Sequence, residues 1–216
     1  MSENPTLVTM EHVRYLADHT QGEDAFLREL KRAAREAGIP PIWIAPEQAS
    51  LMQILLQLTG AREVVEVGTL AGYSAIAMAR ALPPDGRVRT IEIDAARADF
   101  AAAWIARSDV AARVQVLRGS GAEVLSTLAD ASADAAFLDA DKGGYVSYLQ
   151  ECRRIVRTGG LIMADNAFAF GQLFAPQPTD REVAAVRAFN DHVASQPWLQ
   201  GIIVPVGDGL WVCVKS

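Results

Sequence analysis

The sequence predicts an α/β protein with a doubly wound, mainly parallel seven-stranded sheet that ends in an antiparallel hairpin. From about residue 47 onward, short apolar segments rich in β-branched residues alternate with segments of helical periodicity. This alternation implies right-handed crossovers and a parallel sheet with helices on both faces. The last two strand-like segments are joined by a short turn around Gly207-Asp208-Gly209, so we expect them to pair as a hairpin.

Prolines and glycines set the expected limits of several elements. Pro46 stands where a helix can begin, Pro83-Pro84 stops the helix after the first strand, and Gly159-Gly160 ends the last helix. In chain order, we expect helices at residues 11–19, 24–37, 47–58, 72–82, 95–107, 122–128 and 145–156, and strands at residues 64–67, 87–93, 114–117, 135–138, 161–164, 201–206 and 210–214. We expect one domain over residues 1–216, in which residues 1–45 form a helical cap or an oligomer contact.

The composition excludes several classes of protein. A formal net charge of −6 without a cluster of Lys and Arg disfavours nucleic-acid binding, which needs clustered basic side chains. No basic region followed by an apolar run opens the chain, and no long uninterrupted apolar segment occurs, so we expect neither a secretory signal nor a membrane span. Cys152 and Cys213 lie in apolar segments and are expected to be buried, reduced thiols of a cytoplasmic protein.

Glycines mark the turn between the first strand and the next helix, in the run from Glu66 to Ser74. Gly68 and Gly72 let the backbone bend sharply and admit a ligand, and the first N–H groups of the helix can bind an anion. A nicotinamide fingerprint would need glycine where Leu70 stands, which disfavours a dehydrogenase. Glu92 closes the second strand, where a carboxylate is suited to accept hydrogen bonds from ribose hydroxyls. A solvated carboxylate at a strand end is the alternative.

Oxygen-bearing side chains follow the fourth and fifth strands. Asp139, Asp141 and Lys142 end the fourth strand, and Asp165-Asn166 ends the fifth. Ligands bind at the carboxyl ends of parallel strands, and two carboxylates with an amide oxygen suit a hard divalent cation. Helix capping could account for one of the carboxylates, but less readily for the repeat at the neighbouring strand. The histidines and cysteines are scattered and lack the spacing of a zinc site.

Together, Glu66-Val67-Gly68, Gly72-Tyr73-Ser74 and the downstream Glu92 resemble the nucleotide loop of class I S-adenosylmethionine methyltransferases, and more narrowly the cation-dependent O-methyltransferases of the caffeoyl-coenzyme A and catechol type. The resemblance covers roughly residues 40–216 and implies a Rossmann-like methyltransferase fold. In that family the residue matching Ser74 binds the methionine carboxylate and the one matching Glu92 holds the ribose. Cofactor contacts are thereby implied for Ile44, Glu66, Gly68, Thr69, Ser74, Glu92, Ser120, Gly121 and Asp139.

One segment departs from the family pattern. Where most relatives carry Gly-Asp-Ala, with the acidic side chain facing the adenine amine, this chain has Gly119-Ser120-Gly121. A serine hydroxyl still accepts a hydrogen bond, but without the gain that a charged acceptor brings.

The resemblance also implies a metal centre and a base. The residues matching Asp139, Asp165 and Asn166 hold the cation, with Mg²⁺ favoured and Mn²⁺ or Ca²⁺ also compatible. Lys142 matches the base, and Asp141 is assigned to local structure. The implied reaction transfers the methyl group of S-adenosylmethionine to a hydroxyl of a small catechol-like or phenylpropanoid-like acceptor. The family is commonly dimeric, which implies a homodimer.

Other functions remain open at this point. A metal-independent methyltransferase acting on another acceptor, such as RNA or protein, shares the fold, although the acidic charge counts against RNA. A catalytically silent relative could keep the cofactor and lose turnover, which the Ser120-Gly121 pair leaves open. The segment at 167–179 contains three phenylalanines, and they either close over a flat ring or pack on the core.

Overall fold

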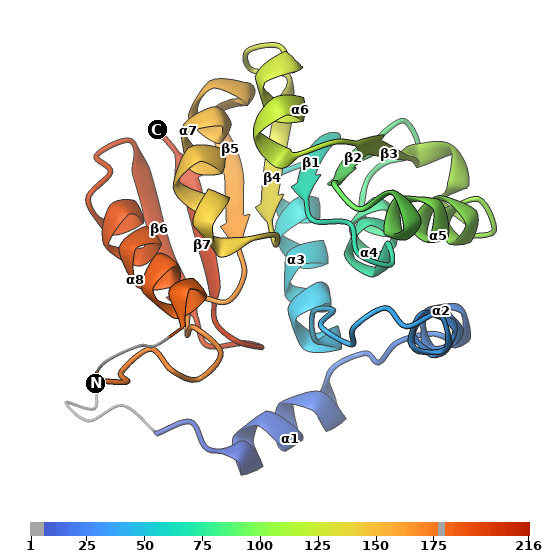
Figure 1. Cartoon of the computed structure of the whole chain (residues 1–216), viewed down its shortest axis with the longest axis horizontal. Helices are drawn as coiled ribbons and strands as arrows, with labels where there is room; N and C mark the ends of the chain where they lie inside the picture. The colour runs from blue at the N-terminus through green and yellow to red at the C-terminus, as the bar shows by residue number, and fades with distance from the viewer. Residues whose placement is uncertain (1–6, 177–179) are drawn as a thin grey trace.

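Figure 1 shows the computed structural model of the chain, which describes residues 7–176 and 180–216. Helices and strands alternate as expected, after three helices that precede the first strand. The elements are α1 (Met10–His19), α2 (Ala25–Glu36), α3 (Pro46–Leu58), β1 (Glu63–Val67), α4 (Tyr73–Ala81), β2 (Arg87–Glu92), α5 (Ala95–Ile105), η1 (Ala111–Arg113), β3 (Val114–Arg118), α6 (Gly121–Thr127), β4 (Ala133–Leu138), η2 (Lys142–Gly144), α7 (Tyr145–Ile155), β5 (Val156–Ala164), α8 (Arg181–Ala194), β6 (Leu199–Val204) and β7 (Leu210–Lys215).

Within the described residues the strands form one seven-stranded sheet in the order β3-β2-β1-β4-β5-β7-β6. Strands β1 to β5 pair parallel, and β7 pairs antiparallel with both β5 and β6. The predicted parallel sheet with a terminal hairpin is therefore confirmed. The strand order reverses between β1 and β4, and a switch of this kind opens a crevice for ligands at the carboxyl ends of the strands.

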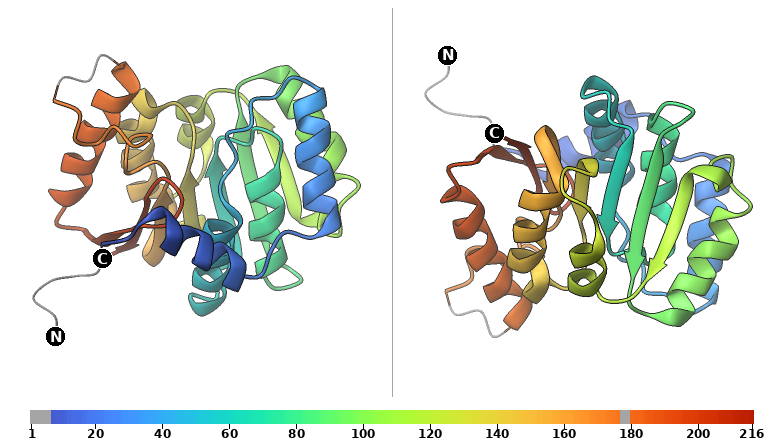
Figure 2. Two further views of the ribbon diagram at one scale, coloured as in Figure 1. Left: turned by 90° about the horizontal axis from the view of Figure 1, so that it is seen from below. Right: turned by 90° about the horizontal axis from the view of Figure 1, so that it is seen from above.

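Alternating side chains of each strand enter two hydrophobic cores. Val64 and Val88 face the helices α2 to α5, whereas Val65 and Ile91 face the layer formed by α6 to α8. Figure 2 shows these two helical layers on opposite faces of the sheet. Both layers support the same edge, the one at which β1, β2, β4 and β5 end.

Two expectations about the second half of the chain were wrong. Helix α7 already ends at Ile155, and β5 begins at Val156, so Gly159-Gly160 lies inside a strand and does not end a helix. The pairing of β4 with β5 shifts register between Ala133 and Ala135, and a Cβ at position 160 would lie 2.7 Å from the carbonyl oxygen of Asp134. Glycine is needed because the two backbones approach closely at this irregularity.

Helix α8 was not predicted at all. Its buried side chains, Val183, Val186, Phe189 and Val193, have helical spacing, so the signal was present in the sequence. The ring of Phe189 packs edge-to-face on Tyr145, with 5.0 Å between the ring centroids. The helix thereby covers the region just after β4.

Two simpler expectations concern the cysteines and the membrane. Cys152 and Cys213 are free and buried, as predicted, and burial raises the pKa of each thiol to about 12. None of the helices in the described ranges is long and apolar enough to cross a bilayer.

Candidate functional site

The glycine turn after β1 is shaped by its contact with β4. Gly68 has φ +104°, and a Cβ at this position would lie only 1.9 Å from the carbonyl oxygen of Asp139. Gly72 has φ +88° at the start of α4. Glycine is required at position 68 both for its backbone conformation and for this close approach. The loops after β1 and β4 are therefore in direct contact.

A buried carboxyl group lies beneath the turn. Glu66 accepts hydrogen bonds from the hydroxyls of Ser74 and Thr90, one at each carboxyl oxygen, and Thr69 Oγ1 lies 2.6 Å from Thr90 Oγ1. All four side chains are buried. Burial raises the pKa of Glu66 to about 8, against the lowering effect of the two hydrogen bonds. The network fixes the turn and the first residues of α4.

The carboxylate of Glu92 binds the same turn from β2. One oxygen accepts the backbone N–H of Leu70 at 2.8 Å, and the other accepts the N–H of Asp94 at 3.0 Å. Leu70 has φ +51°, a conformation that is unfavourable for a leucine. The hydrogen bond from Leu70 offsets part of this strain, and it holds the glycine turn against the end of β2.

The third loop of this edge begins α6. Ser120 caps the helix: its hydroxyl accepts the N–H of Glu123 at 3.3 Å and donates to the Glu123 carboxylate at 2.7 Å. Gly121 is buried, and a Cβ there would lie 2.7 Å from Val67 and 2.8 Å from the ring of Tyr148. Packing alone therefore requires glycine at position 121.

Beyond β4, a buried lysine is held by two oxygen atoms. Lys142 Nζ lies 3.3 Å from a carboxylate oxygen of Asp139 and donates to the hydroxyl of Tyr145 at 2.7 Å. That hydroxyl donates in turn to the carbonyl of Leu138 at 3.1 Å. Asp141 accepts the hydroxyl of Tyr148 at 2.6 Å, so it has the local structural contact expected of it.

Two further oxygen-bearing side chains follow β5. Asp165 is buried and accepts a hydrogen bond from Gln48 Nε2 at 2.8 Å. Asn166 has φ +63°, and its side-chain nitrogen donates to Asp208 at 3.2 Å. Because the amide nitrogen has this partner, the amide oxygen of Asn166 is left for other ligands.

The carboxyl groups of Asp139 and Asp165 repel each other. Burial, and next the negative charge of Asp139, raise the pKa of Asp165 to about 7, and burial raises the pKa of Asp139 as well. A cation placed between two such groups would relieve the repulsion. No cluster of three or more His, Cys, Asp and Glu side chains suited to a metal occurs in the described part of the chain. The predicted set contains only two such residues, and its third member is an amide.

Comparison with known proteins identifies the family. The model of a family described as O-methyltransferase matches residues 17–216. The chain belongs to the O-methyltransferase family.

Individual relatives support the same family assignment. A catechol O-methyltransferase of Niastella koreensis is 38% identical over 190 residues, which cover 87% of this chain and 85% of the relative. Tricin synthase 2 of Oryza sativa subsp. japonica is 32% identical, over 88% of this chain and 69% of the relative. Among solved structures, this chain is similar to the O-methyltransferase TomG from Streptomyces achromogenes, which is involved in tomaymycin synthesis and was crystallised in complex with SAM. The match has a TM-score of 0.85 and 30% identity, and it covers 95% of this chain and 96% of TomG.

In this O-methyltransferase the sequence-predicted residues form two adjoining groups. One group surrounds the glycine turn and the other surrounds Lys142, and they meet where Gly68 contacts Asp139. Ile44 is also buried, in the core formed with α2 to α5. The first group consists of Glu66, Gly68, Thr69, Ser74 and Glu92, with Ser120 and Gly121 at the next strand end, and the second of Asp139, Lys142, Asp165 and Asn166.

Sequence reasoning missed four polar residues of this site. Thr90 pairs in register with Glu66 on β1, and Tyr145 stands one helical turn after Lys142, so both had a local signal. Gln48 reaches Asp165 from α3, far away in the sequence, and no local pattern reveals that contact. Asp208 was interpreted mainly as a turn residue, but its carboxylate also accepts the backbone N–H of Phe170 at 2.8 Å.

The aromatic residues of the segment after β5 behave differently from one another. Phe168 is partly buried against Gly209, where a Cβ would lie 2.8 Å from its ring. Phe170 is 44% exposed, with its ring centroid 6.0 Å from Lys142 Nζ, and Phe174 is 90% exposed. One of the rings therefore packs on the protein and another lies over the lysine. Residues 177–179 of the predicted loop lie outside the described residues.

Proposed function

We propose that this O-methyltransferase transfers the methyl group of S-adenosylmethionine to a hydroxyl of a small catechol-like or phenylpropanoid-like acceptor. The names of the catechol and tricin relatives and the SAM complex of TomG support this proposal. The observation that carries it is the direct contact of the glycine turn with the loop of Asp139 and Lys142. A methyl donor on the turn would lie beside a buried amine.

The glycine turn is the proposed cofactor site. Ser74 would bind the methionine carboxylate at the start of α4. Each carboxylate oxygen of Glu92 accepts one backbone N–H, from Leu70 or from Asp94, and has a further lone pair with which it would accept a ribose hydroxyl. Ser120 would accept the adenine amine as a neutral acceptor. The remaining proposed contacts come from Ile44, Glu66, Gly68, Thr69, Gly121 and Asp139.

The donor set after β4 and β5 fits a hard divalent cation, and we assign Asp139, Asp165 and Asn166 as its ligands. Their ligand atoms are all oxygens. Burial raises the pKa of both carboxyls, and the charge of Asp139 further raises that of Asp165, so a cation between them would stabilise their charged forms. Mg²⁺ fits best, because it retains open positions when few protein ligands hold it; Mn²⁺ or Ca²⁺ are the alternatives. Such an ion would lower the pKa of two adjacent acceptor hydroxyls.

Lys142 is the proposed base. Asp139 and Tyr145 hold its amino group in place, and Phe170 lies over it. Lys142 removes the proton of the reacting hydroxyl. S-adenosylmethionine on the glycine turn would supply the methyl group to the resulting oxygen, with S-adenosylhomocysteine as the leaving product.

A turnover assay with catechol and S-adenosylmethionine tests the proposal. We expect methylated product with Mg²⁺ and loss of turnover in excess chelator, restored by added Mg²⁺. Full activity in chelator would instead indicate a metal-independent methyltransferase. Calorimetric binding of S-adenosylmethionine with no turnover of catechol or phenylpropanoid acceptors would indicate a non-catalytic relative.

We further propose that the chain is one domain that acts as a cytoplasmic homodimer. Side chains of α2 enter the main core, whereas α1 has no buried residue within the described structure. Met10, Val13 and Leu16 are exposed on α1, and a second copy of the chain is the proposed cover for them. The two free cysteines fit a reducing compartment, and the acidic net charge disfavours nucleic acid as a partner.

A further inference from the structure

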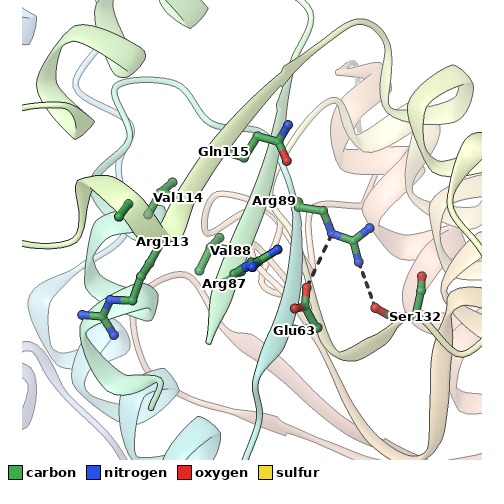
Figure 3. Close-up of a pocket in the computed structure, with 9 residues that line it drawn as sticks. Glu63, Arg87, Val88, Arg89, Arg113, Val114, Gln115 and Ser132 are labelled. Atoms are coloured by element: carbon green, nitrogen blue, oxygen red, sulfur yellow. Dashed lines mark hydrogen bonds and ion pairs between the residues drawn. The ribbon is translucent and has the colours of Figure 1, made fainter. Parts of the chain in front are cut away.

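The opposite edge of the sheet, where β1 to β3 begin, carries a polar pocket. Arg87, Arg89 and Gln115 alternate along β2 and β3, and the register places Glu63 beside Arg87 and Gln115 beside Arg89. In the right-hand view of Figure 2 no helix crosses the beginnings of these strands. A cavity of about 500 Å³ lies there, lined by Glu63, Arg87, Val88, Arg89, Ala112, Arg113, Val114, Gln115 and Ser132 (Figure 3). We call it the amino-edge pocket.

The arginines of the amino-edge pocket lack close carboxylate partners. Arg89 donates to the carbonyl of Ser132 at 2.9 Å, whereas Glu63 lies 3.9 Å from its Nε, and this buried Nε has no hydrogen-bond partner in the described structure. Arg113 donates only to carbonyl groups, among them that of Leu82 at 3.1 Å. The backbone N–H of Arg87 donates to the carbonyl of Arg62 at 2.7 Å, but its side chain makes no hydrogen bond or ion pair with the residues described.

Other arginines at the same edge are neutralised. Arg62 forms an ion pair with Asp85, and Arg157 pairs with Asp134 at 2.6 Å. The pocket therefore places the guanidinium groups of Arg87 and Arg89 beside the single carboxylate of Glu63, in a chain whose net charge is −6. The guanidinium group of Arg113 points away from them (Figure 3).

A solvated sheet face would also carry charged side chains. The side chain of Arg89 is only 20% exposed, however, so its charge is largely removed from water while its Nε is left without an acceptor. Such a group is costly unless an anion approaches it. The guanidinium groups of Arg87 and Arg89, which share one face of the sheet, can match the oxygens of a phosphoryl group.

We propose that the amino-edge pocket binds a small phosphorylated solute, with Arg87 as the direct ligand and Arg89 supplying further positive charge. The site is separate from the candidate active site. Arg87 and Glu92 stand at opposite ends of β2, and five residues of extended chain span about 16 Å. The proposal for this pocket therefore does not rest on the proposed methyl transfer.

Calorimetric titration of the full chain with inorganic pyrophosphate tests this site. We expect saturable binding that weakens about tenfold in Arg87→Ala, because one charge-assisted contact is lost. Arg62→Ala is the matched control: it removes an arginine at the same edge that lies outside the lining residues, and it should leave the affinity unchanged.

A second variant is expected to change the affinity for pyrophosphate in the opposite direction. Glu63→Gln removes the carboxylate of the pocket while keeping its shape, so pyrophosphate should bind several-fold more tightly. The proposal is overturned by absence of binding at millimolar pyrophosphate, by equal weakening in Arg62→Ala and Arg87→Ala, or by weaker binding in Glu63→Gln. Binding of vesicles that contain phosphatidic acid, without binding of pyrophosphate, would likewise overturn it in favour of a lipid headgroup.

Discussion

At the scale of single residues, the site combines buried groups that share protons. Lys142 lies between the carboxylate of Asp139 and the hydroxyl of Tyr145, and Glu66 lies beneath the glycine turn with two hydroxyl donors. Groups of this kind are costly to bury unless their partners are fixed. Substitutions here should therefore separate chemistry from binding and from stability.

Lys142→Ala should reduce kcat by about 10²-fold to 10⁴-fold, the range of a lost general base. The affinity for S-adenosylmethionine should change little, because the proposed cofactor contacts belong to the neighbouring turn. Steady-state kinetics and calorimetry measure the two quantities. Lys215→Ala, which removes a lysine from the end of β7, serves as the control. An unchanged kcat in Lys142→Ala would remove this residue from the mechanism.

Glu66→Gln should flatten the pH dependence of stability. Since the pKa of Glu66 rises from 4.5 to about 8 on folding, the native state holds its proton up to a higher pH than the unfolded chain does. This contribution is complete below pH 4.5 and is lost as the pH rises to about 8. Thermal unfolding between pH 5 and 9 should show a smaller decline in Tm for Glu66→Gln than for wild type or for the exposed control Glu36→Gln. An identical decline in Tm for wild type and both variants would show that folding does not raise the pKa of Glu66.

At the scale of elements, each loop of the carboxyl edge is fastened to a neighbouring loop. Gly68 contacts the backbone of Asp139, Glu92 binds the turn at Leu70, and Asp208 binds the segment after β5 through Phe170. The hairpin turn thus positions the aromatic segment that follows the proposed metal ligands. A change in the mobility of one loop should therefore change the mobility of the loop beside it.

Asp208→Ala should loosen the segment at residues 166–170. The variant loses the acceptor of Asn166 Nδ2 and of the Phe170 N–H, so hydrogen exchange of this segment should quicken and the KM for catechol should rise several-fold. Asp208→Asn retains a side-chain oxygen and should have a milder effect. Equal exchange rates in Asp208→Ala and wild type would exclude this anchoring role.

The sequence was most informative where chemistry is local to a strand end. Gly68, Glu92, Asp139 and Asp165 could be recognised because each directly follows or ends a predicted strand of a parallel sheet. Gln48 could not be recognised, because its role depends on how α3 packs across the sheet. The bulge at Gly159-Gly160 was mistaken for a helix end, because glycine marks both features and only the pairing of β4 with β5 distinguishes them.

At the scale of the whole molecule, the two edges of the sheet differ in character. The carboxyl edge gathers acidic side chains around Lys142, whereas the amino edge gathers arginines around Glu63. Helix α1 lies at the periphery of the molecule (Figure 1), and its apolar side chains Met10, Val13 and Leu16 are exposed. This exposure is the reason to expect assembly.

Val13→Glu should convert the proposed homodimer into a monomer, because it places a charge within the apolar surface of α1. Light scattering after size-exclusion chromatography measures the mass. Arg14→Glu alters the charge of the neighbouring residue without removing an apolar side chain, and should remain dimeric. A monomeric wild type would contradict the proposed assembly.

The hydroxyl of Tyr145 has only one hydrogen, and it is directed at the carbonyl of Leu138. Toward Lys142 it is therefore an acceptor only, whatever the protonation state of the amine. With a second N–H of Lys142 directed at Asp139, one tetrahedral position of the nitrogen is left over. That position carries a hydrogen in the ammonium ion and the lone pair in the free amine. In the proposed mechanism, Tyr145 thus helps to set the direction from which Lys142 takes the proton.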